Sequence, residues 1–298
     1  MNRNVLLLLL LAACWSPSFL FIKIGLASVP PFTLTAMRVA LGGLLLYVML
    51  VARGRALPRD WKTWKLFLFM GFFANALPFS LFSFGELHAE SGAAAVINGT
   101  TPLFTVVLAH LFIAEERLDT RALAGVVVGF AGVAVMFYPQ IVGLVRGGGG
   151  AGTLLGLGAF AAAACSYGVS IVHSRRHLRG LPPNVAPAAQ LLCATALLAP
   201  LAVLERPWEA DMSAGSLAAV GALAVLGTAV AYRVYYRLIE TASATFVSLV
   251  TYIMPPAGVV LGIVFLAERP GWEAAAGCAL ILGGVMLVNF ARRSNRPS

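Results

Sequence analysis

The sequence predicts an all-α integral membrane protein, in which ten transmembrane helices form two inverted five-helix repeats around a central cavity. Three observations predict this fold class. Of the 298 residues, 60% are hydrophobic and only 11% are charged. The apolar residues fall in ten stretches of about 20 residues, which is the length that a helix needs to cross a membrane. Finally, residues of the first half recur in the second half about 152 positions later.

Each apolar stretch is predicted to form one membrane-spanning helix. A soluble domain carries about 25% charged residues, so a chain with 11% could not cover a globule with polar side chains. The mean hydropathy of +0.88 agrees with this reading. The ten stretches are residues 5–26, 32–52, 64–85, 91–114, 120–138, 153–172, 184–204, 214–236, 242–266 and 272–291. The linkers between them are short, which leaves no room for a separate soluble domain.

A repeated pattern divides the chain into two halves. Its clearest members, each 152 residues from its partner, are Pro30-Pro31 with Pro182-Pro183, and Glu116-Arg117 with Glu268-Arg269. Because each copy holds an odd number of spans, the second copy must insert in the opposite orientation. Inverted repeats are typical of secondary transporters, in which the solute binds near the membrane midplane between the halves. We expect the first repeat at residues 1–143, a glycine-rich linker at 144–152 and the second repeat at 153–298.

The basic residues orient the predicted helices. The net charge is +9, and sixteen Lys and Arg residues lie in segments on the side of the two termini. The opposite side carries only Lys23, Arg146, Arg206 and Arg269. Positive residues gather on the cytoplasmic side of membrane proteins, so we expect both termini in the cytoplasm. The location that fits is a bacterial inner membrane, and this distribution argues against binding of nucleic acid.

Few residues are suited to chemistry at a metal or catalytic centre. The four cysteines lie inside apolar stretches without CxxC spacing, and the four histidines form no ligand or catalytic group. We therefore expect no cofactor, no metal and no enzyme activity. All twelve acidic residues fall at the ends of the predicted helices or between them, so no carboxylate that could couple transport to an ion is visible.

One charge is predicted inside the membrane. Arg38 lies about 10 Å from the end of the second stretch, at 1.5 Å per residue. A buried arginine needs a partner, and Glu86 and Glu90 follow the third stretch. We expect Arg38 to have a structural role, in which it pairs with one of these two carboxylates.

Neutral polar and aromatic residues are predicted to line the central cavity. The substrate-binding candidates are Trp15, Ser16, Asn75, Pro78, Asn98, Thr101, Ser166, Tyr167, Tyr232, Ser248, Thr251 and Tyr252. The fourth and ninth stretches contain predicted hinges at Gly99, Pro102, Pro255 and Pro256. A proline frees a backbone carbonyl one turn earlier. The ends of such broken helices can bind the carboxylate and ammonium groups of an amino acid without a fixed charge.

Several of these features resemble the EamA branch of the drug/metabolite transporter superfamily. The similar features are Trp15-Ser16, Arg38, the proline patches, an acidic residue after the fourth helix of each half (Glu115-Glu116, Glu268) and a glycine-rich fifth helix. The resemblance covers nearly the whole chain and is strongest to the bacterial amino-acid exporters of the YddG type. It implies ten helices, cytoplasmic termini and efflux of metabolites. The second half departs from the pattern, with Ser166 where Trp is common and Gln190 opposite Arg38.

The sequence thus predicts a secondary transporter that exports small neutral or zwitterionic solutes, above all aromatic or apolar amino acids, by alternating access. Its expected partners are the solute and the lipid bilayer, and we expect a monomer. A multidrug or quaternary-amine exporter is the alternative, which an aromatic cage could serve. An intramembrane enzyme is a further alternative, but it would need a His/Asp or metal set near one interface. A pore is disfavoured because broken helices in inverted halves suggest gating.

Overall fold

The first half of the chain consists of helices joined by short turns. The computed structural model describes residues 3–113, 119–146, 150–177, 185–242, 244–247 and 249–294, and these residues contain no β-strand. The elements of the first half are α1 (Arg3–Trp15), α2 (Ser18–Gly25), α3 (Pro31–Val51), α4 (Trp61–Gly71), η1 (Phe72–Ala76), α5 (Leu77–Glu86), α6 (Ser91–Asn98), α7 (Thr101–Phe112) and α8 (Thr120–Val145).

The second half repeats this order. Its elements are α9 (Ala151–His177), α10 (Val185–Leu204), η2 (Pro207–Glu209), α11 (Ala214–Ala224), η3 (Val225–Val230), α12 (Ala231–Thr241), α13 (Ala244–Val247), α14 (Val250–Leu266) and α15 (Trp272–Ser294). Each fifth helix starts at the matching place, since α8 begins at Thr120 and α15 begins at Trp272, 152 residues later.

The helices confirm the predicted all-α membrane fold. Within the described residues, nine helical segments are long and apolar enough to cross a membrane, and α14 is a tenth, shorter apolar helix of 17 residues. Its shortness has a local cause, because the predicted ninth span is divided into α13 and α14. The fourth span is likewise divided into α6 and α7, around Asn98 and Thr101.

The outer faces of the helices are apolar, as contact with lipid requires. In α3, Leu46 and Leu50 are 1% and 2% exposed, whereas Leu44 and Val48 on the other face are 54% and 55% exposed. A soluble protein rarely exposes so many large apolar side chains in one band. The chain is therefore a multi-pass membrane protein.

The fifth helices of the two halves cross in an antiparallel pair that reveals the inversion. A Cβ atom added at Gly125 of α8 would lie 2.7 Å from the carbonyl oxygen of Gly284 in α15. The matching contact, 152 residues along, brings Gly277 of α15 to 2.9 Å from the carbonyl oxygen of Gly132 in α8. Glycine lets two backbones approach this closely in a membrane. Shifting each residue by the 152-residue repeat turns one contact into the other. The halves are therefore related by a two-fold axis between these helices.

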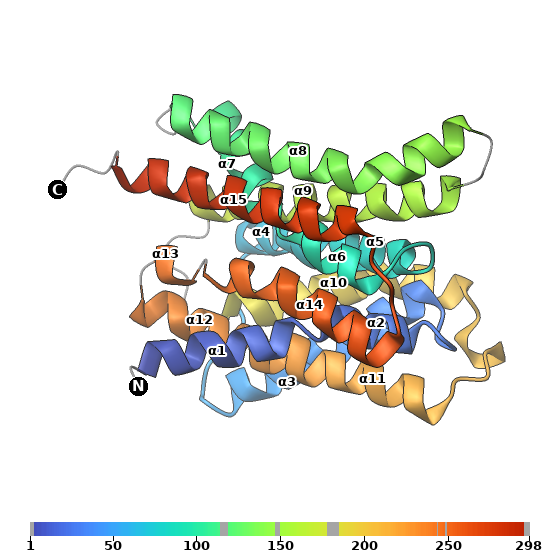
Figure 1. The fold of residues 1–298 in the computed structure, drawn as a ribbon. Helices are drawn as coiled ribbons and strands as arrows, with labels where there is room; N and C mark the ends of the chain where they lie inside the picture. Colours follow the sequence, from blue (N-terminus) through green and yellow to red (C-terminus); the bar gives the residue numbers. More distant parts are fainter. Residues whose placement is uncertain are drawn as a thin grey trace.

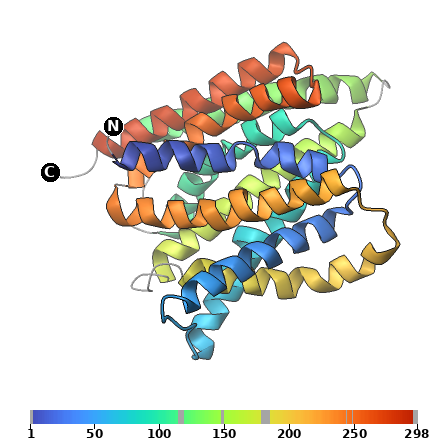
Figure 2. The same ribbon diagram turned by 90° about the horizontal axis from the view of Figure 1, so that it is seen from below.

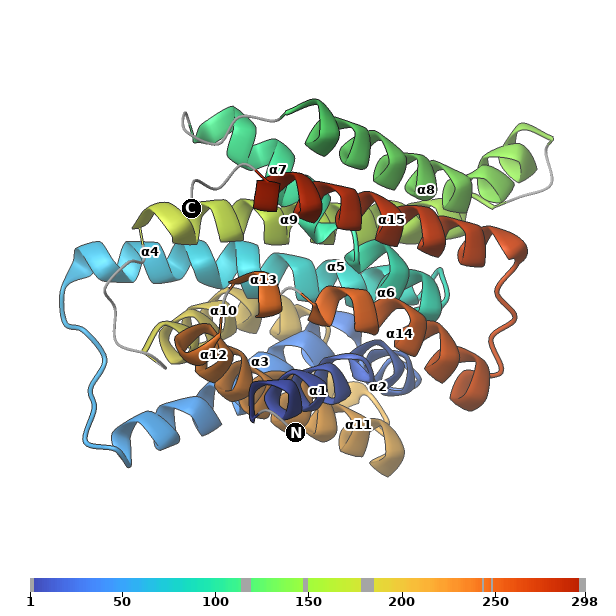
Figure 3. The same ribbon diagram turned by 60° about the vertical axis from the view of Figure 1, so that its left-hand side comes forward.

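Both ends of the chain lie at the same end of the bundle (Figures 1 and 2). We call this end the terminal end and the opposite end, which carries the turn between α5 and α6, the distal end. Helices α8 and α15 lie together along one side of the bundle, and α1, α3, α11 and α12 lie on the other (Figure 3). Of the predicted linker, residues 144–146 and 150–152 lie at the distal end, and residues 147–149 are outside the described part of the chain.

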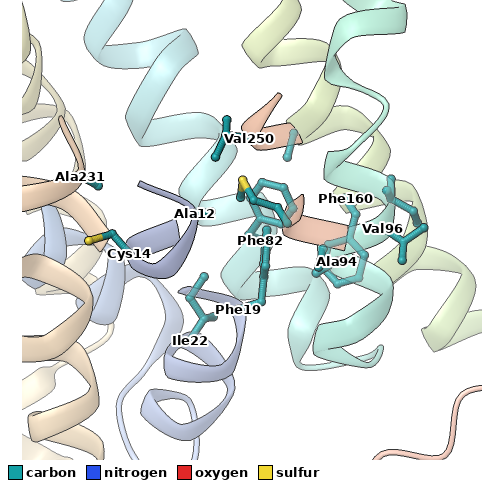
Figure 4. Close-up of a cluster of buried hydrophobic side chains, with 14 of the residues drawn as sticks. Ala12, Cys14, Phe19, Ile22, Phe82, Ala94, Val96, Phe160, Ala231 and Val250 are labelled. Carbon is teal, nitrogen blue, oxygen red and sulfur yellow. The ribbon is translucent and has the colours of Figure 1, made fainter. Parts of the chain in front are cut away.

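A cluster of buried apolar side chains joins the halves (Figure 4). It brings Phe19 of α2, Phe82 of α5 and Phe160 of α9 together, with ring centroids 5.2 Å apart for Phe19 and Phe82 and 5.8 Å apart for Phe82 and Phe160. Cys14 is buried among these residues and is not part of a disulfide. This packing lies beside the polar residues described next.

Candidate functional site

The third span of each half switches from α- to π-helix partway along. In the first half this segment is η1 (Phe72–Ala76), between α4 and α5, and in the second half it is η3 (Val225–Val230), between α11 and α12. The two segments occupy nearly equivalent places in the repeat. Short π-helical segments are uncommon in proteins overall. Those that occur are often at functional sites, because they shift side chains relative to the rest of the helix. They therefore mark a candidate site.

A buried polar side chain in each π-segment caps a carbonyl five residues earlier. Asn75 donates from Nδ2 to the carbonyl oxygen of Met70 at 3.3 Å, and Thr228 donates from Oγ1 to the carbonyl oxygen of Leu223 at 3.1 Å. Both side chains are 0% exposed. Widening the helix leaves carbonyl groups without their usual donor, and a buried unpaired carbonyl is costly. Asn75 and Thr228 thus have equivalent structural roles in the two halves.

Each of these side chains also accepts a hydrogen bond from the opposite half. The Tyr232 hydroxyl of α12 donates to Oδ1 of Asn75 at 2.7 Å. Nε of Arg38, in α3, donates to Oγ1 of Thr228 at 3.0 Å. The first half therefore binds the second half through Asn75, and the second half binds the first through Thr228. We call Arg38, Asn75, Thr228 and Tyr232 the central polar cluster.

The buried guanidinium group of Arg38 is not paired with a carboxylate in the described part of the chain. Arg38 is 5% exposed, and its guanidinium carbon lies 3.7 Å from the centroid of the Phe79 ring, a cation–π contact. The expected pairing with Glu86 or Glu90 is therefore wrong. The reason is geometric, because a hydrogen bond of 3.1 Å between Thr35 and Ser83 packs α3 against α5, with Arg38 on the inner side of this contact and Glu86 on the distal side.

Aromatic rings extend from the central polar cluster to the first span. Tyr232 lies 6.4 Å from Tyr236, Tyr236 lies 5.5 Å from Tyr235, and Tyr235 lies 5.5 Å from Trp15, measured between ring centroids. Tyr167 of α9 stacks on Phe82 with centroids 6.2 Å apart, and it packs on the same buried apolar cluster as Tyr232. The candidates Trp15, Asn75, Tyr167 and Tyr232 are thus part of one polar and aromatic interior.

Four buried oxygens of the first, fourth and seventh spans have no hydrogen-bond partner in the described structure. They are Oγ of Ser16 and of Ser18, at the break between α1 and α2, Oδ1 of Asn98 at the end of α6, and Oε1 of Gln190 in α10. Gln190 is the counterpart of Arg38, 152 residues later, and is 2% exposed. Buried polar atoms are paired in most proteins, so unpaired acceptors often mark a place that a ligand fills.

The other predicted substrate-binding residues have different surroundings. Ser166 donates to the carbonyl oxygen of Phe73 in η1 at 2.7 Å, and Thr101 donates to that of Asn98 at 2.8 Å. Pro78 is buried in the first turn of α5. Tyr252 accepts a hydrogen bond of 2.6 Å from Asn289 of α15 and packs in a separate apolar cluster. Thr251 is half-buried in α14, and Ser248 lies outside the described residues.

The predicted hinge residues lie at and near the breaks in the fourth and ninth spans. Gly99 follows α6, and Pro102 lies in the first turn of α7, so both are at the break. Pro255 and Pro256 lie inside α14 instead. A Cβ atom at Gly99 would be 3.0 Å from Cγ of Pro255, which shows that the fourth and ninth spans contact each other at these residues.

The distal ends of these two spans are joined by a carboxylate. Oε1 of Glu268 accepts hydrogen bonds of 2.7 Å from both the N–H and the hydroxyl of Ser91, and Oε2 accepts one of 3.0 Å from the N–H of Gly92. These donors form the N-terminus of α6, where a carboxylate is favourable. Ala267, with φ of 54°, ends α14 and turns Glu268 toward α6.

A second carboxylate and two serines tie the halves together at the same end. Glu205, after α10, accepts hydrogen bonds from the N–H groups of Phe32 and Thr33 at 3.0 and 2.7 Å. The N–H of Ser213 donates to the Ser28 hydroxyl at 2.9 Å. The distal ends of the halves are therefore closed on each other. A cavity of about 490 Å³ lies between the turn that follows α5 and the turn that precedes α15.

Sequence reasoning missed Thr228 as a residue of interest, and it did not foresee the burial of Glu86. Thr228 is a single hydroxyl inside an apolar run. Its contacts with Leu223 and Arg38 depend on the π-helical segment, which has no clear sequence signature. Glu86 ends α5 and is 1% exposed. The sequence places it at the end of an apolar stretch as a candidate partner of Arg38, and tertiary packing buries it without that pairing.

Two inverted sets of membrane-spanning helices, with broken spans that meet at a polar interior, define a secondary transporter. The chain belongs to the EamA-like transporter family, whose model matches residues 2–138 and 154–290. The two matches begin and end 152 residues apart. The resemblance to this family is therefore confirmed, while the boundaries of the halves at residues 143 and 153 stay a prediction.

Two similar proteins are named as transporters. The chain is 27% identical to the uncharacterized inner membrane transporter YedA of Escherichia coli strain K12, over 93% of this chain and 88% of YedA. It is 30% identical to the aromatic amino acid exporter YddG of Ancylobacter novellus, over 89% of this chain and 90% of YddG. One solved crystal structure is similar with a TM-score of 0.68 and 25% identity, over 98% of this chain and 99% of that one.

Proposed function

We propose that this transporter exports zwitterionic amino acids, in particular those with aromatic or apolar side chains, across a bacterial inner membrane. The two halves would open alternately to the cytoplasm at the terminal end and to the outside at the distal end. The positive-inside distribution supports this orientation. The name of the YddG relative supports the class of solute.

The observation that carries the proposal is the buried Arg38 guanidinium, which has no carboxylate partner among the described residues. An uncompensated positive charge favours a solute with a carboxylate group and repels a cation. The unpaired oxygens of Ser16, Asn98 and Gln190 can accept hydrogen bonds from an ammonium group. The rings from Trp15 to Tyr232 provide contact for an apolar or aromatic side chain.

The multidrug alternative is weakened by the same charge. A quaternary amine would need an acidic residue or an aromatic cage free of positive charge. Arg38 contacts Phe79 and is joined through Thr228 to the segment that precedes Tyr232, so a cation bound among these rings would face repulsion.

Counterflow in proteoliposomes tests the proposal. Vesicles that contain the purified protein are preloaded with unlabelled phenylalanine, and labelled phenylalanine, methionine or threonine is added outside at fixed pH without an ion gradient. We expect transient accumulation of labelled phenylalanine and methionine, and none in protein-free vesicles. Accumulation of a labelled quaternary ammonium compound, with none of the amino acids, would contradict the proposal and support the multidrug exporter.

A further inference from the structure

Glu86 is a buried acid without a partner. It is the last residue of α5, it is 1% exposed, and neither carboxylate oxygen has a hydrogen-bond partner in the described part of the chain. An ionised carboxylate that is buried and unpaired costs several kcal/mol relative to water. The arrangement in this structure therefore suits the neutral acid, with a proton on one oxygen.

The nearest cation makes no hydrogen bond to the Glu86 carboxylate in this structure. The Lys23 ammonium, from α2, donates to the backbone carbonyl oxygens of Glu86 and Ala89, the latter at 2.9 Å. Arg38 of α3 is directed toward Thr228. Helix α9 packs on this part of α5 with the uncharged residues Gly156 and Phe160. The charged and titratable groups around the turn and its cavity are Lys23, Arg38, His88, Glu90, Glu268, Arg269 and Glu273.

None of these neighbours donates a hydrogen bond to the Glu86 carboxylate, and a second acid lies close by. Glu90 lies at the start of α6, and its pKa is raised, first by partial burial and then by the negative charge of Glu268. A metal cation is a poor alternative occupant, because Lys23 already holds the adjacent carbonyl oxygens. In the described residues no group of three or more His, Cys, Asp and Glu side chains could hold a metal ion.

The cavity of about 490 Å³ at the distal end lies within one helical turn of Glu86. Lys23, Leu87 and Ala89 line this cavity, although Glu86 itself does not. The Glu268 carboxylate, which binds the N-terminus of α6, lines the same cavity. If the distal ends separate, the turn that carries Glu86 loses its cover and the carboxyl group meets water beside Lys23.

We propose that Glu86 is a proton-binding site that links closure of the distal end to uptake of one proton. In the closed state the carboxyl group is buried and neutral. On opening, the proton passes to water in the distal cavity, and the carboxylate that remains is stabilised by the Lys23 ammonium. The inference rests on the proposed function only in taking distal opening as a step of the transport cycle. Linkage of one proton changes the open-to-closed ratio by up to about tenfold per pH unit.

The first test measures the protonation state of the Glu86 carboxyl group and does not depend on transport. Infrared spectra of the purified protein in lipid, at pH 7, separate the carbonyl band of a protonated carboxylic acid from that of a carboxylate. We expect such a band in the wild type, its loss in Glu86→Gln, and its retention in Glu90→Gln, the matched control in the same turn. The absence of a band in the wild type, or its presence in Glu86→Gln at full strength, would overturn the proposal.

The second test measures whether proton binding at Glu86 affects opening of the distal end, through the pH dependence of the exchange rate. We expect wild-type counterflow of phenylalanine to slow as the pH on the distal side is lowered from 8 to 6, by up to about tenfold per unit. In Glu86→Gln the rate should not respond to pH, whereas Glu90→Gln should still respond. A response that persists in Glu86→Gln or disappears only in Glu90→Gln would refute the role of Glu86. Failure of the wild type to exchange phenylalanine would instead reject the proposed function, and the infrared result would still decide whether Glu86 binds a proton.

Discussion

Tyr232 of the second half donates a hydrogen bond of 2.7 Å to Asn75 of the first half, at a π-helical segment. The reciprocal bond runs from Arg38 of the first half to Thr228 of the second half, at the other π-helical segment. The two repeats are therefore joined by a pair of equivalent but chemically different contacts. Relative movement of the halves during transport must either preserve these contacts as a pivot or break both of them.

The contact between Asn75 and Tyr232 is expected to be energetically coupled. Asn75→Ala removes the cap on the Met70 carbonyl and the acceptor for Tyr232, so the free energy of unfolding should fall by about 1–3 kcal/mol. Tyr232→Phe leaves Oδ1 of Asn75 unpaired and should cost less. Denaturant unfolding in detergent, applied to both single variants and the double variant, measures the coupling. Fully additive effects would show that the two residues act independently.

Arg38 is expected to select solutes by their carboxylate group. Phenylalanine should inhibit wild-type counterflow of labelled phenylalanine more strongly than phenylalanine amide, which lacks the carboxylate. In Arg38→Gln this preference should shrink by about tenfold or more, since a charged hydrogen bond of about 1.5–3 kcal/mol is lost. Arg38→Lys keeps the charge and serves as the comparison. An unchanged preference in Arg38→Gln, in protein that remains folded, would assign Arg38 to structure alone.

The crossing of α8 and α15 should tolerate no side chain at its glycines. A Cβ atom at Gly125 would lie 2.7, 2.8 and 2.9 Å from atoms of Gly284 and Val288, so Gly125→Ala forces the helices apart. We expect a loss of stability of about 1–3 kcal/mol. Gly283, in α15, has no atom within 4 Å of an added Cβ atom and provides the matched control. Equal thermal stability of Gly125→Ala and Gly283→Ala would contradict the close crossing.

Much of the fold could be predicted from the sequence because the bilayer imposes simple rules. Apolar stretches of about 20 residues predicted the spans, and Gly99 and Pro102 predicted the break between α6 and α7. The recurrence of Gly125 at Gly277 predicted equivalent fifth helices, which the structure places in contact. These signals are local or periodic, so a single sequence contains them.

The site was less accessible to sequence reasoning because its key contacts depend on tertiary packing. The π-helical segments move Asn75 and Thr228 into the interior. No local residue pattern predicts this change from α- to π-helix. The predicted pairing of Arg38 was wrong. Counting residues along the spans places Arg38 and Glu86 at similar depths in the membrane, but in the structure Glu86 lies beyond the contact between Thr35 and Ser83. The burial of Glu86 likewise comes from its neighbours in α2 and α9, which the sequence does not place beside it.

The central claim is that the interior between Trp15 and Asn98 binds the transported amino acid. The most direct measurement is counterflow of labelled phenylalanine by Trp15→Ala and Asn98→Ala, beside Trp61→Ala, which removes a tryptophan that is 68% exposed at the terminal end. All three proteins must first elute as folded material with wild-type thermal stability to within a few degrees. The account predicts exchange at least about tenfold slower in Trp15→Ala and Asn98→Ala and unchanged in Trp61→Ala. Wild-type exchange in both interior variants would contradict it.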